Sequence, residues 1–317
     1  MEAILKGVYV GIDVAKHHWD VAIAGRRGVR RFRADEAGLT ELLAWLEKPK
    51  PQLVCLEATG GYERALRAAL QKQGFPVSVV NPRQIRDFAR SAGELAKTDA
   101  IDADMIARFA ATFHPEPDDP PTPALERLRT LRARRQQVIH SLTQEKNRLA
   151  AVPDAEARES IEEAIKFYER QLRELDRKLT ELTSTDPVLR ERLALLVTVP
   201  GVGVVTAAAL LAELPELGAM NRGQAAKLVG LAPINRDSGS LRGKRMIGGG
   251  RSQVRRSLYM ATLTATKHNK TIHSYYQQLL QRGKAKMTAI VACMRKLLLI
   301  LNAMLKKQLP WSEAPPT

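Results

Sequence analysis

A long repeat of apolar residues restricts what the middle of this chain can fold into. Over residues 161–182, apolar residues recur at spacings of four and three, with charged residues between them. This spacing puts the apolar residues on one side of an α-helix, as in the seam of a coiled coil. A weaker series over 128–149 precedes a turn at Pro153-Asp154. The pattern predicts a long antiparallel helical hairpin over 124–185, with self-association or a partner helix as a further role.

The residues before the hairpin alternate between two kinds of pattern. Short apolar runs typical of strands are separated by amphipathic stretches typical of helices, and a proline-rich linker over 114–123 follows them. This alternation indicates an α/β domain over residues 1–115 with a partly parallel sheet. The predicted strands lie within 8–24 and at 28–34, 52–57 and 77–80, and the predicted helices at 39–46 and 62–73.

Four acidic residues of this domain are predicted to meet at one edge of the sheet. Asp13 and Glu57 each fall near the end of a predicted strand, where active sites of such sheets gather. Asp99 and Asp102 are three residues apart, which puts both on one helix face and requires a counter-charge from Lys97 or a bound cation. Carboxylate oxygens suit Mg²⁺ or Mn²⁺, and two such ions could clamp a phosphodiester during displacement.

The positive charge of the chain is concentrated in its last third. The net charge is +16, and residues 221–317 contain eighteen Lys and Arg against two acids, so the first 220 residues are neutral overall. Clustered Lys and Arg favour a polyanion, because phosphate neutralisation releases counterions. Nucleic acid is the leading partner and an anionic membrane surface is the weaker one.

Several other classes of protein are excluded by composition. Cys55 and Cys293 are far apart and have no CxxC or Cys/His neighbours, which argues against a disulfide scaffold or a zinc module. The N-terminal residues lack the pattern of a signal peptide. The apolar runs at 197–214 and 287–305 are interrupted by prolines, glycines or charges, so neither is a convincing membrane span. We therefore expect a cytoplasmic protein with no membrane partner.

A serine-, glycine- and arginine-rich stretch over residues 230–260 dominates the basic third. Three glycines at 248–250 precede a basic helical segment, so backbone N–H groups there are available to an anion. A serine that attacks a phosphodiester needs activation and nearby positive charge. Ser238 and Ser240 are both candidates, although a serine in such a loop is more often a turn residue. The charges predicted to bind nucleic acid are Arg242, Lys244, Arg245, Arg251, Arg255 and Arg256.

The rest of the region 186–317 is predicted to be mainly α-helical. Residues 199–214 (VPGVGVVTAAALLAEL) have the pattern of two helices joined by a GxG turn. Such a turn is either a helix-hairpin-helix grip on a phosphate or a tight turn between packed helices. The second interpretation is slightly favoured by the sequence alone.

Four motifs, in this order, resemble the DEDD transposases of bacterial insertion sequences. They are GIDVAK with Asp13, LEATGGYE with Glu57, KTDAIDADMIA with Asp99 and Asp102, and VPGVG followed by GLAP and DSGSLRGKRMIGGGRSQVRRSLY. The resemblance is to the insertion-sequence family numbered one hundred and ten, and it extends from the first strand to about Ala265. The order and spacing of the motifs make it specific.

The resemblance implies a fold, a chemistry and a set of partners. The expected fold is a RuvC-like (RNase H-like) N-terminal domain, a coiled-coil insert and a C-terminal transposase domain. The four acids would bind Mg²⁺, and Ser238 would form a covalent phosphoserine link to DNA. Target and donor DNA, a structured guide RNA from the element and a homo-oligomer with a shared active site are the implied partners.

Two other functions stay open at this point. One is a metal-dependent nuclease of the Holliday-junction type, in which the acids activate water and Ser238 has only a structural role. The other is a non-catalytic nucleic-acid-binding protein that assembles through its coiled coil.

Overall fold

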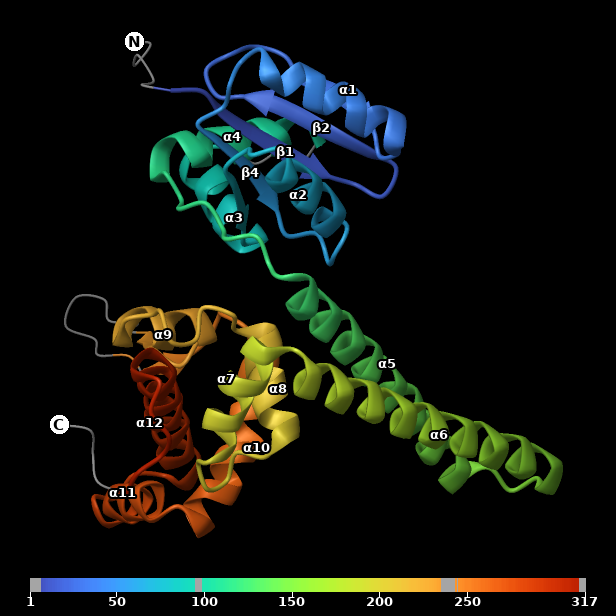
Figure 1. The fold of residues 1–317 in the computed structure, drawn as a ribbon, viewed down its shortest axis with the longest axis vertical. Helices are drawn as coiled ribbons and strands as arrows, with labels where there is room; N and C mark the ends of the chain where they lie inside the picture. Colours follow the sequence, from blue (N-terminus) through green and yellow to red (C-terminus); the bar gives the residue numbers. More distant parts are fainter. Residues whose placement is uncertain (1–6, 95–98, 235–242, 244, 314–317) are drawn as a thin grey trace. The chain divides into compact units, whose positions relative to one another are not determined.

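The computed structural model describes residues 7–94, 99–234, 243 and 245–313, apart from the side chains of 99–101 (Figure 1). The chain forms two compact units, Met1–Pro120 and Pro121–Thr317. The predicted hairpin and the predicted C-terminal domain both fall within the second unit.

The first unit is built on a mixed five-stranded sheet in the order β3-β2-β1-β4-β5. The first three strands pair antiparallel, whereas β1, β4 and β5 run parallel. The sequence-based prediction of an α/β region with a partly parallel sheet is therefore confirmed. The strands are β1 (Tyr9–Val14), β2 (His18–Ile23), β3 (Arg30–Arg33), β4 (Leu53–Glu57) and β5 (Val77–Val80).

Helices cover both faces of this sheet. Side chains alternate along a strand, so each strand contributes to two separate apolar layers. One layer contains Ile12, Leu42 and Leu66, and joins the strands to α1 (Glu36–Glu47) and α2 (Glu63–Lys72). The other layer joins them to α3 (Pro82–Ser91) and α4 (Asp99–Phe113).

Helix α4 lies unusually close to strand β1 at Gly11. A Cβ atom on Gly11 would lie 2.2 Å from the backbone nitrogen of Ala107 and 2.4 Å from the carbonyl oxygen of Ala103. Both atoms belong to the helix backbone, which has no flexible group to move aside. Only glycine at this position lets α4 pack directly on the strand.

Replacing Gly11 with alanine is expected to lower the free energy of unfolding by about 1–3 kcal/mol, because the helix must move off the sheet. Urea denaturation followed by circular dichroism would measure the change. The matched control is Gly203→Ala, since a Cβ atom there meets nothing within 4 Å. Equal stability of the two variants would contradict the close packing at Gly11.

The second unit begins with the predicted antiparallel hairpin. It consists of α5 (Pro123–Ala151) and α6 (Ala155–Thr185), and ion pairs join the two helices at Arg135–Asp176 (2.6 Å) and Lys146–Glu169 (2.9 Å). The hairpin predicted from the sequence is confirmed. Its apolar seam is buried near the base, at Leu175, Leu179 and Leu182, but only half-buried at Ile161, Ile165, Tyr168 and Leu172 toward the tip.

The rest of the second unit is a helical core, as predicted, with one small two-stranded sheet. Helix α12 passes a membrane-span test on length and composition, with a mean hydropathy of 1.7, but 56% of the tested window is buried inside the unit. Burial in this core accounts for its apolar residues. The elements are α7 (Pro187–Val197), α8 (Val204–Glu213), α9 (Arg222–Val229), β6 (Pro233–Ile234), β7 (Met246–Ile247), α10 (Ser252–His268), α11 (Lys270–Gln281) and α12 (Lys286–Lys307).

Candidate active site

Asp13 and Glu57 occupy adjacent positions on neighbouring parallel strands. The last register pair between β1 and β4 joins Ile12 to Leu56, so the next residue on each strand is Asp13 and Glu57. Both side chains are half-buried. Because side chains alternate along a strand, Asp13 faces α4 as Gly11 does, and Glu57 follows in the same row. The two strand-end acids predicted from the sequence therefore lie side by side on one face.

Asp102 lies where α4 crosses this face. It is half-buried and directly precedes Ala103, whose carbonyl oxygen sits over Gly11 in β1. Asp99 is the first residue of α4, and its side chain lies outside the described residues. Within the described part of the chain, no three His, Cys, Asp or Glu side chains are close enough together to hold a metal ion. The predicted ligands are nevertheless all carboxylates, the donor type that Mg²⁺ and Mn²⁺ prefer.

The loop after Glu57 is held in place by a buried carboxylate. Glu63 accepts hydrogen bonds from the backbone nitrogens of Thr59 (3.2 Å) and Gly61 (2.8 Å). Gly60 and Gly61 have φ angles of 73° and 119°, which favour glycine. The loop conformation, and with it the backbone beside Glu57, is therefore fixed by Glu63. The motif LEATGGYE contains Glu63, but the sequence assigned it no role.

A further acid at this edge was missed by the sequence analysis. Asp20 on β2 is the register partner of Asp13, and Arg31 on β3 is the register partner of Asp20. Asp20 is only 3% exposed and accepts hydrogen bonds from Nε and Nη2 of Arg31 at 2.8 and 2.7 Å. The charge beside Asp13 is thus neutralised within the sheet. Asp20 could have been identified from the sequence, because an acid at an inward-facing position of a predicted strand is unusual.

The serine-containing stretch connects β6 and β7, which pair antiparallel with Ile234 opposite Met246. Four predicted site residues of this stretch lie outside the described residues: Ser238, Ser240, Arg242 and Lys244.

Close backbone contacts join the chain before and after this stretch. Gly230 ends α9 in the left-handed conformation, and a Cβ atom on it would lie 2.2 Å from the carbonyl oxygen of Gly249. A Cβ atom on Gly250 would lie 2.4 Å from the nitrogen of Gly230. Arg255 donates from Nη1 to the carbonyl oxygens of Val229 (2.9 Å) and Gly249. We call Gly230, Gly249, Gly250 and Arg255 the glycine clasp.

The predicted phosphate-binding arginines differ in their surroundings. Arg251 forms two hydrogen bonds of 2.6 Å to the carboxylate of Glu216 and one of 3.0 Å to the carbonyl oxygen of Glu213. Burial raises the pKa of Glu216, but hydrogen bonding to Arg251 and the arginine charge lower it more, so the pKa lies below its ordinary value. Arg245 and Arg256 are exposed to solvent. Arg251 and Arg255 therefore bind protein groups, and Arg245 and Arg256 are the exposed members of the described set.

Arg251→Gln is expected to change the stability of the protein, whereas Arg256→Gln is expected to change its affinity for DNA. Loss of the Glu216 contacts should lower the free energy of unfolding by about 1 kcal/mol. Loss of the exposed Arg256 should leave stability within about 0.5 kcal/mol but lower the slope of log affinity against log salt for DNA by about 1. Urea denaturation and fluorescence anisotropy would measure the two quantities. A reversed pattern would show that Arg251 is the DNA contact.

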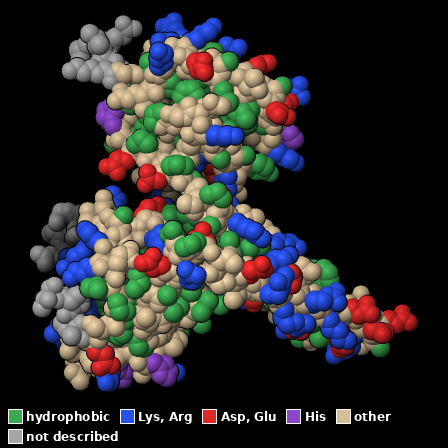
Figure 2. Space-filling view, viewed as in Figure 1, with side chains coloured by type: hydrophobic (Ala, Val, Ile, Leu, Met, Phe, Trp, Pro, Cys, Tyr) green, Lys and Arg blue, Asp and Glu red, His purple; other side chains and the backbone are tan. Residues whose placement is uncertain are grey.

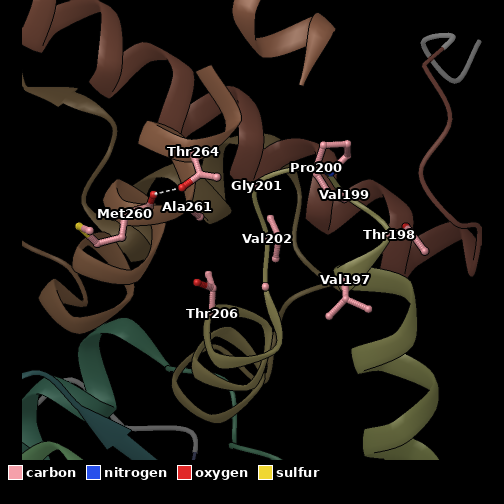
Figure 3. Close-up of a pocket in the computed structure, with 11 residues that line it drawn as sticks. Val197, Thr198, Val199, Pro200, Gly201, Val202, Thr206, Met260, Ala261 and Thr264 are labelled. Atoms are coloured by element: carbon pink, nitrogen blue, oxygen red, sulfur yellow. Dashed lines mark hydrogen bonds between the residues drawn. The ribbon is translucent and has the colours of Figure 1, made fainter. Parts of the chain in front are cut away.

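The GxG motif forms a turn between α7 and α8. Gly201 has a φ of 100°, and a Cβ atom on it would lie 2.6 Å from the backbone nitrogen of Ala265 in α10. Figure 3 shows the hollow that the turn makes with α10, lined by Val202, Thr206 and Met260 among others. The turn is packed between helices, which is the interpretation that the sequence slightly favoured; phosphate binding by its backbone is the alternative.

Comparisons with known proteins match both parts of the chain. The family model DEDD_Tnp_IS110, described as a transposase, matches residues 10–154, and a model described as the transposase IS116/IS110/IS902 family matches residues 193–277. The pilin gene-inverting proteins of Moraxella bovis and Moraxella lacunata are each 28% identical over 315 residues, covering 96% of this chain and 98% of the relative. An uncharacterized 42 kDa protein of insertion element IS900 from Mycobacterium paratuberculosis is 29% identical over 150 residues, covering 44% of this chain and 37% of that protein.

Proposed function

Because this chain belongs to the IS110 family of transposases and is a DNA-recombining enzyme, we propose that it cuts and rejoins DNA through a covalent phosphoserine intermediate. The N-terminal unit would have a RuvC-like fold and supply a metal-binding acid site. The second unit would supply the nucleophile. The proposed site residues are Asp13, Glu57, Asp99, Asp102 and Ser238.

The proposed acid site is supported by the row of carboxylates on the face of the sheet that α4 covers. Asp13 and Glu57 are adjacent in register, and Asp102 lies on the helix that crosses β1 at Gly11. A row of carboxylates on one face offers the oxygen ligands that a divalent cation prefers. The carboxylates would hold Mg²⁺ or Mn²⁺, which when bound stabilises negative charge on phosphate oxygens.

The nucleophile would be the hydroxyl of Ser238. As the serine oxygen bonds to phosphorus, the bond to one deoxyribose oxygen breaks, so the phosphodiester is exchanged and no energy source is needed. Attack by a deoxyribose hydroxyl from another DNA end then reverses the step and releases the serine. Arg245 and Arg256, which are exposed, would stabilise the added negative charge together with Arg242 and Lys244. Ser240 is the alternative nucleophile.

We further propose that the enzyme works as a homo-oligomer with an active site shared between subunits. The half-buried apolar residues toward the tip of the hairpin, Ile161, Ile165, Tyr168 and Leu172, are suited to contact a second copy. Target and donor DNA would both be substrates. A structured guide RNA is carried over from the family resemblance, and the basic last third of the chain has the charge to bind it.

Covalent trapping tests this proposal. Full-length protein is mixed with Mg²⁺, element-end DNA and co-purified RNA, separated on a denaturing gel, and any adduct is located by mass spectrometry. A DNA adduct on Ser238 is expected. Cleaved DNA without an adduct would instead assign the Holliday-junction type of nuclease. Binding without cleavage would assign a non-catalytic nucleic-acid-binding role.

A further inference from the structure

The first unit contains its own concentration of arginine, although the first 220 residues are neutral overall. The segment 26–33 reads RRGVRRFR and includes no acid. All five of its arginines are exposed, and Figure 2 shows Lys and Arg side chains on the first unit as well as on the second. None of these arginines belongs to the proposed catalytic set. The segment is the turn between β2 and β3 followed by β3 itself.

The position of this segment in the sheet makes it accessible. β3 is the last strand of the sheet, and no described strand pairs with its outer side. Phe32 fixes the strand, because its ring is 2% exposed and lies 5.9 Å from the ring of Trp45. The guanidinium of Arg30 lies 5.0 Å from the centre of the Phe32 ring. The strand is thus held by one buried aromatic side chain while its arginines remain at the surface.

The arginines divide into two groups by their partners. Arg31 pairs with Asp20, and Arg33 pairs with Asp35 at 2.8 Å. In the part of the chain that the structure describes, no acid pairs with Arg26, Arg27 or Arg30. Their charges are therefore balanced by solvent counterions, which a bound phosphate would release.

The sheet register connects this segment to the acid row. Arg31 is opposite Asp20, and Asp20 is opposite Asp13, so β3 lies two strands from β1. Arg31 is thus level with Asp13, whereas Ile23 is opposite Val10, so the turn that holds Arg26 and Arg27 lies beyond the opposite end of β1 from Asp13. Arg30 lies on the other face of the sheet from Asp13, because side chains alternate along a strand. Two strand spacings amount to about 10 Å and five residues along a strand to about 16 Å, so the turn lies on the order of 20 Å from the acid row, about six base steps of DNA. DNA that runs from the acid row along the outer side of β3 would therefore reach these arginines.

We propose that Arg26, Arg27 and Arg30, which we call the arginine track, bind backbone phosphates of the DNA that flanks the cut site. The identity of the polyanion as DNA rests on the proposed function. Charged side chains on an edge strand also prevent pairing with other sheets, a role that needs no ligand. The two roles differ in salt dependence, because only phosphate binding makes DNA affinity depend on these side chains.

The test compares two triple variants of the full-length protein that lose the same charge. One replaces the track, R26Q/R27Q/R30Q, and the control replaces three exposed arginines of α3, R83Q/R86Q/R90Q. Affinity for duplex DNA is measured by fluorescence anisotropy at several salt concentrations, without divalent ions and with Ser238→Ala in every variant. The track variant should bind at least about tenfold more weakly at 0.15 M salt, with a salt slope lower by about 3. The control should bind within about twofold of the parent.

A third variant, R26K/R27K/R30K, keeps the charge and should retain most of the salt slope, while circular dichroism confirms that each variant is folded. Equal losses in the track and control variants would overturn the proposal, as would unchanged binding in the track variant. A loss of affinity for RNA alone would overturn the assignment to DNA. Because no chemistry is measured, failure of the covalent mechanism would leave these results unaffected.

Discussion

Ser238→Ala is expected to abolish both the DNA–protein adduct and strand exchange. The alanine removes the oxygen that would bond to phosphorus in the proposed mechanism, and loss of a covalent nucleophile lowers turnover by about 10⁴-fold or more. Quantitative trapping and recombination assays with element-end DNA would measure both effects. DNA affinity should be unchanged, since a neutral hydroxyl contributes little to phosphate neutralisation.

Ser240→Ala is the matched control, because Ser240 lies two residues away in the same loop. It should keep strand exchange within about tenfold of the parent. Loss of the adduct only in Ser240→Ala would move the nucleophile to Ser240 and keep the mechanism. Cleavage that persists in both variants would refute the serine mechanism.

Asp102→Asn is expected to lower the rate of DNA cleavage by about 10³-fold or more while the protein stays folded. The amide is the same size as the carboxylate but carries no charge, so it is a much weaker ligand for Mg²⁺. Both cleavage and adduct formation should fall, because in the proposed mechanism the acid site would act in the step that forms the adduct. Cleavage rates over a range of Mg²⁺ concentrations would measure the effect.

Asp104→Asn is the control for this prediction. Asp104 lies on the same helix, pairs with Arg108 at 3.8 Å, and has a pKa raised by burial. Its replacement should change the cleavage rate by less than about tenfold. Equal losses in the two variants would point to damage of α4, and an active Asp102→Asn enzyme would remove Asp102 from the metal site.

The sequence predicted those parts of the fold that depend on local pattern. Strand β5 was predicted at its observed bounds, because a short apolar run between turns identifies a buried strand. The hairpin was predicted because its apolar repeat is long. Helices α3 and α11 were not predicted, since each has only one buried residue, Ile85 and Ile272 respectively.

Features that depend on register or on close packing could not be predicted. The neutralisation of Asp20 by Arg31 requires knowing which residues of β2 and β3 face each other. Likewise, the sequence shows that Arg251 and Arg255 are basic, but not that Glu216 and three carbonyl oxygens receive their hydrogen bonds. Charge alone assigned both arginines to nucleic acid, because a sequence does not show which charges the fold uses internally.

The glycine clasp has a consequence for how this family can diversify. It brings together residues 230 and 249–250, so the two ends of the chain between them are held by contacts outside that chain. The entropy of closing a loop rises slowly, by about 0.6 kcal/mol for each doubling of its length. Insertions and deletions near the serine would therefore cost the fold little. Evolution can alter the serine-containing segment while the helices that hold its two ends stay the same.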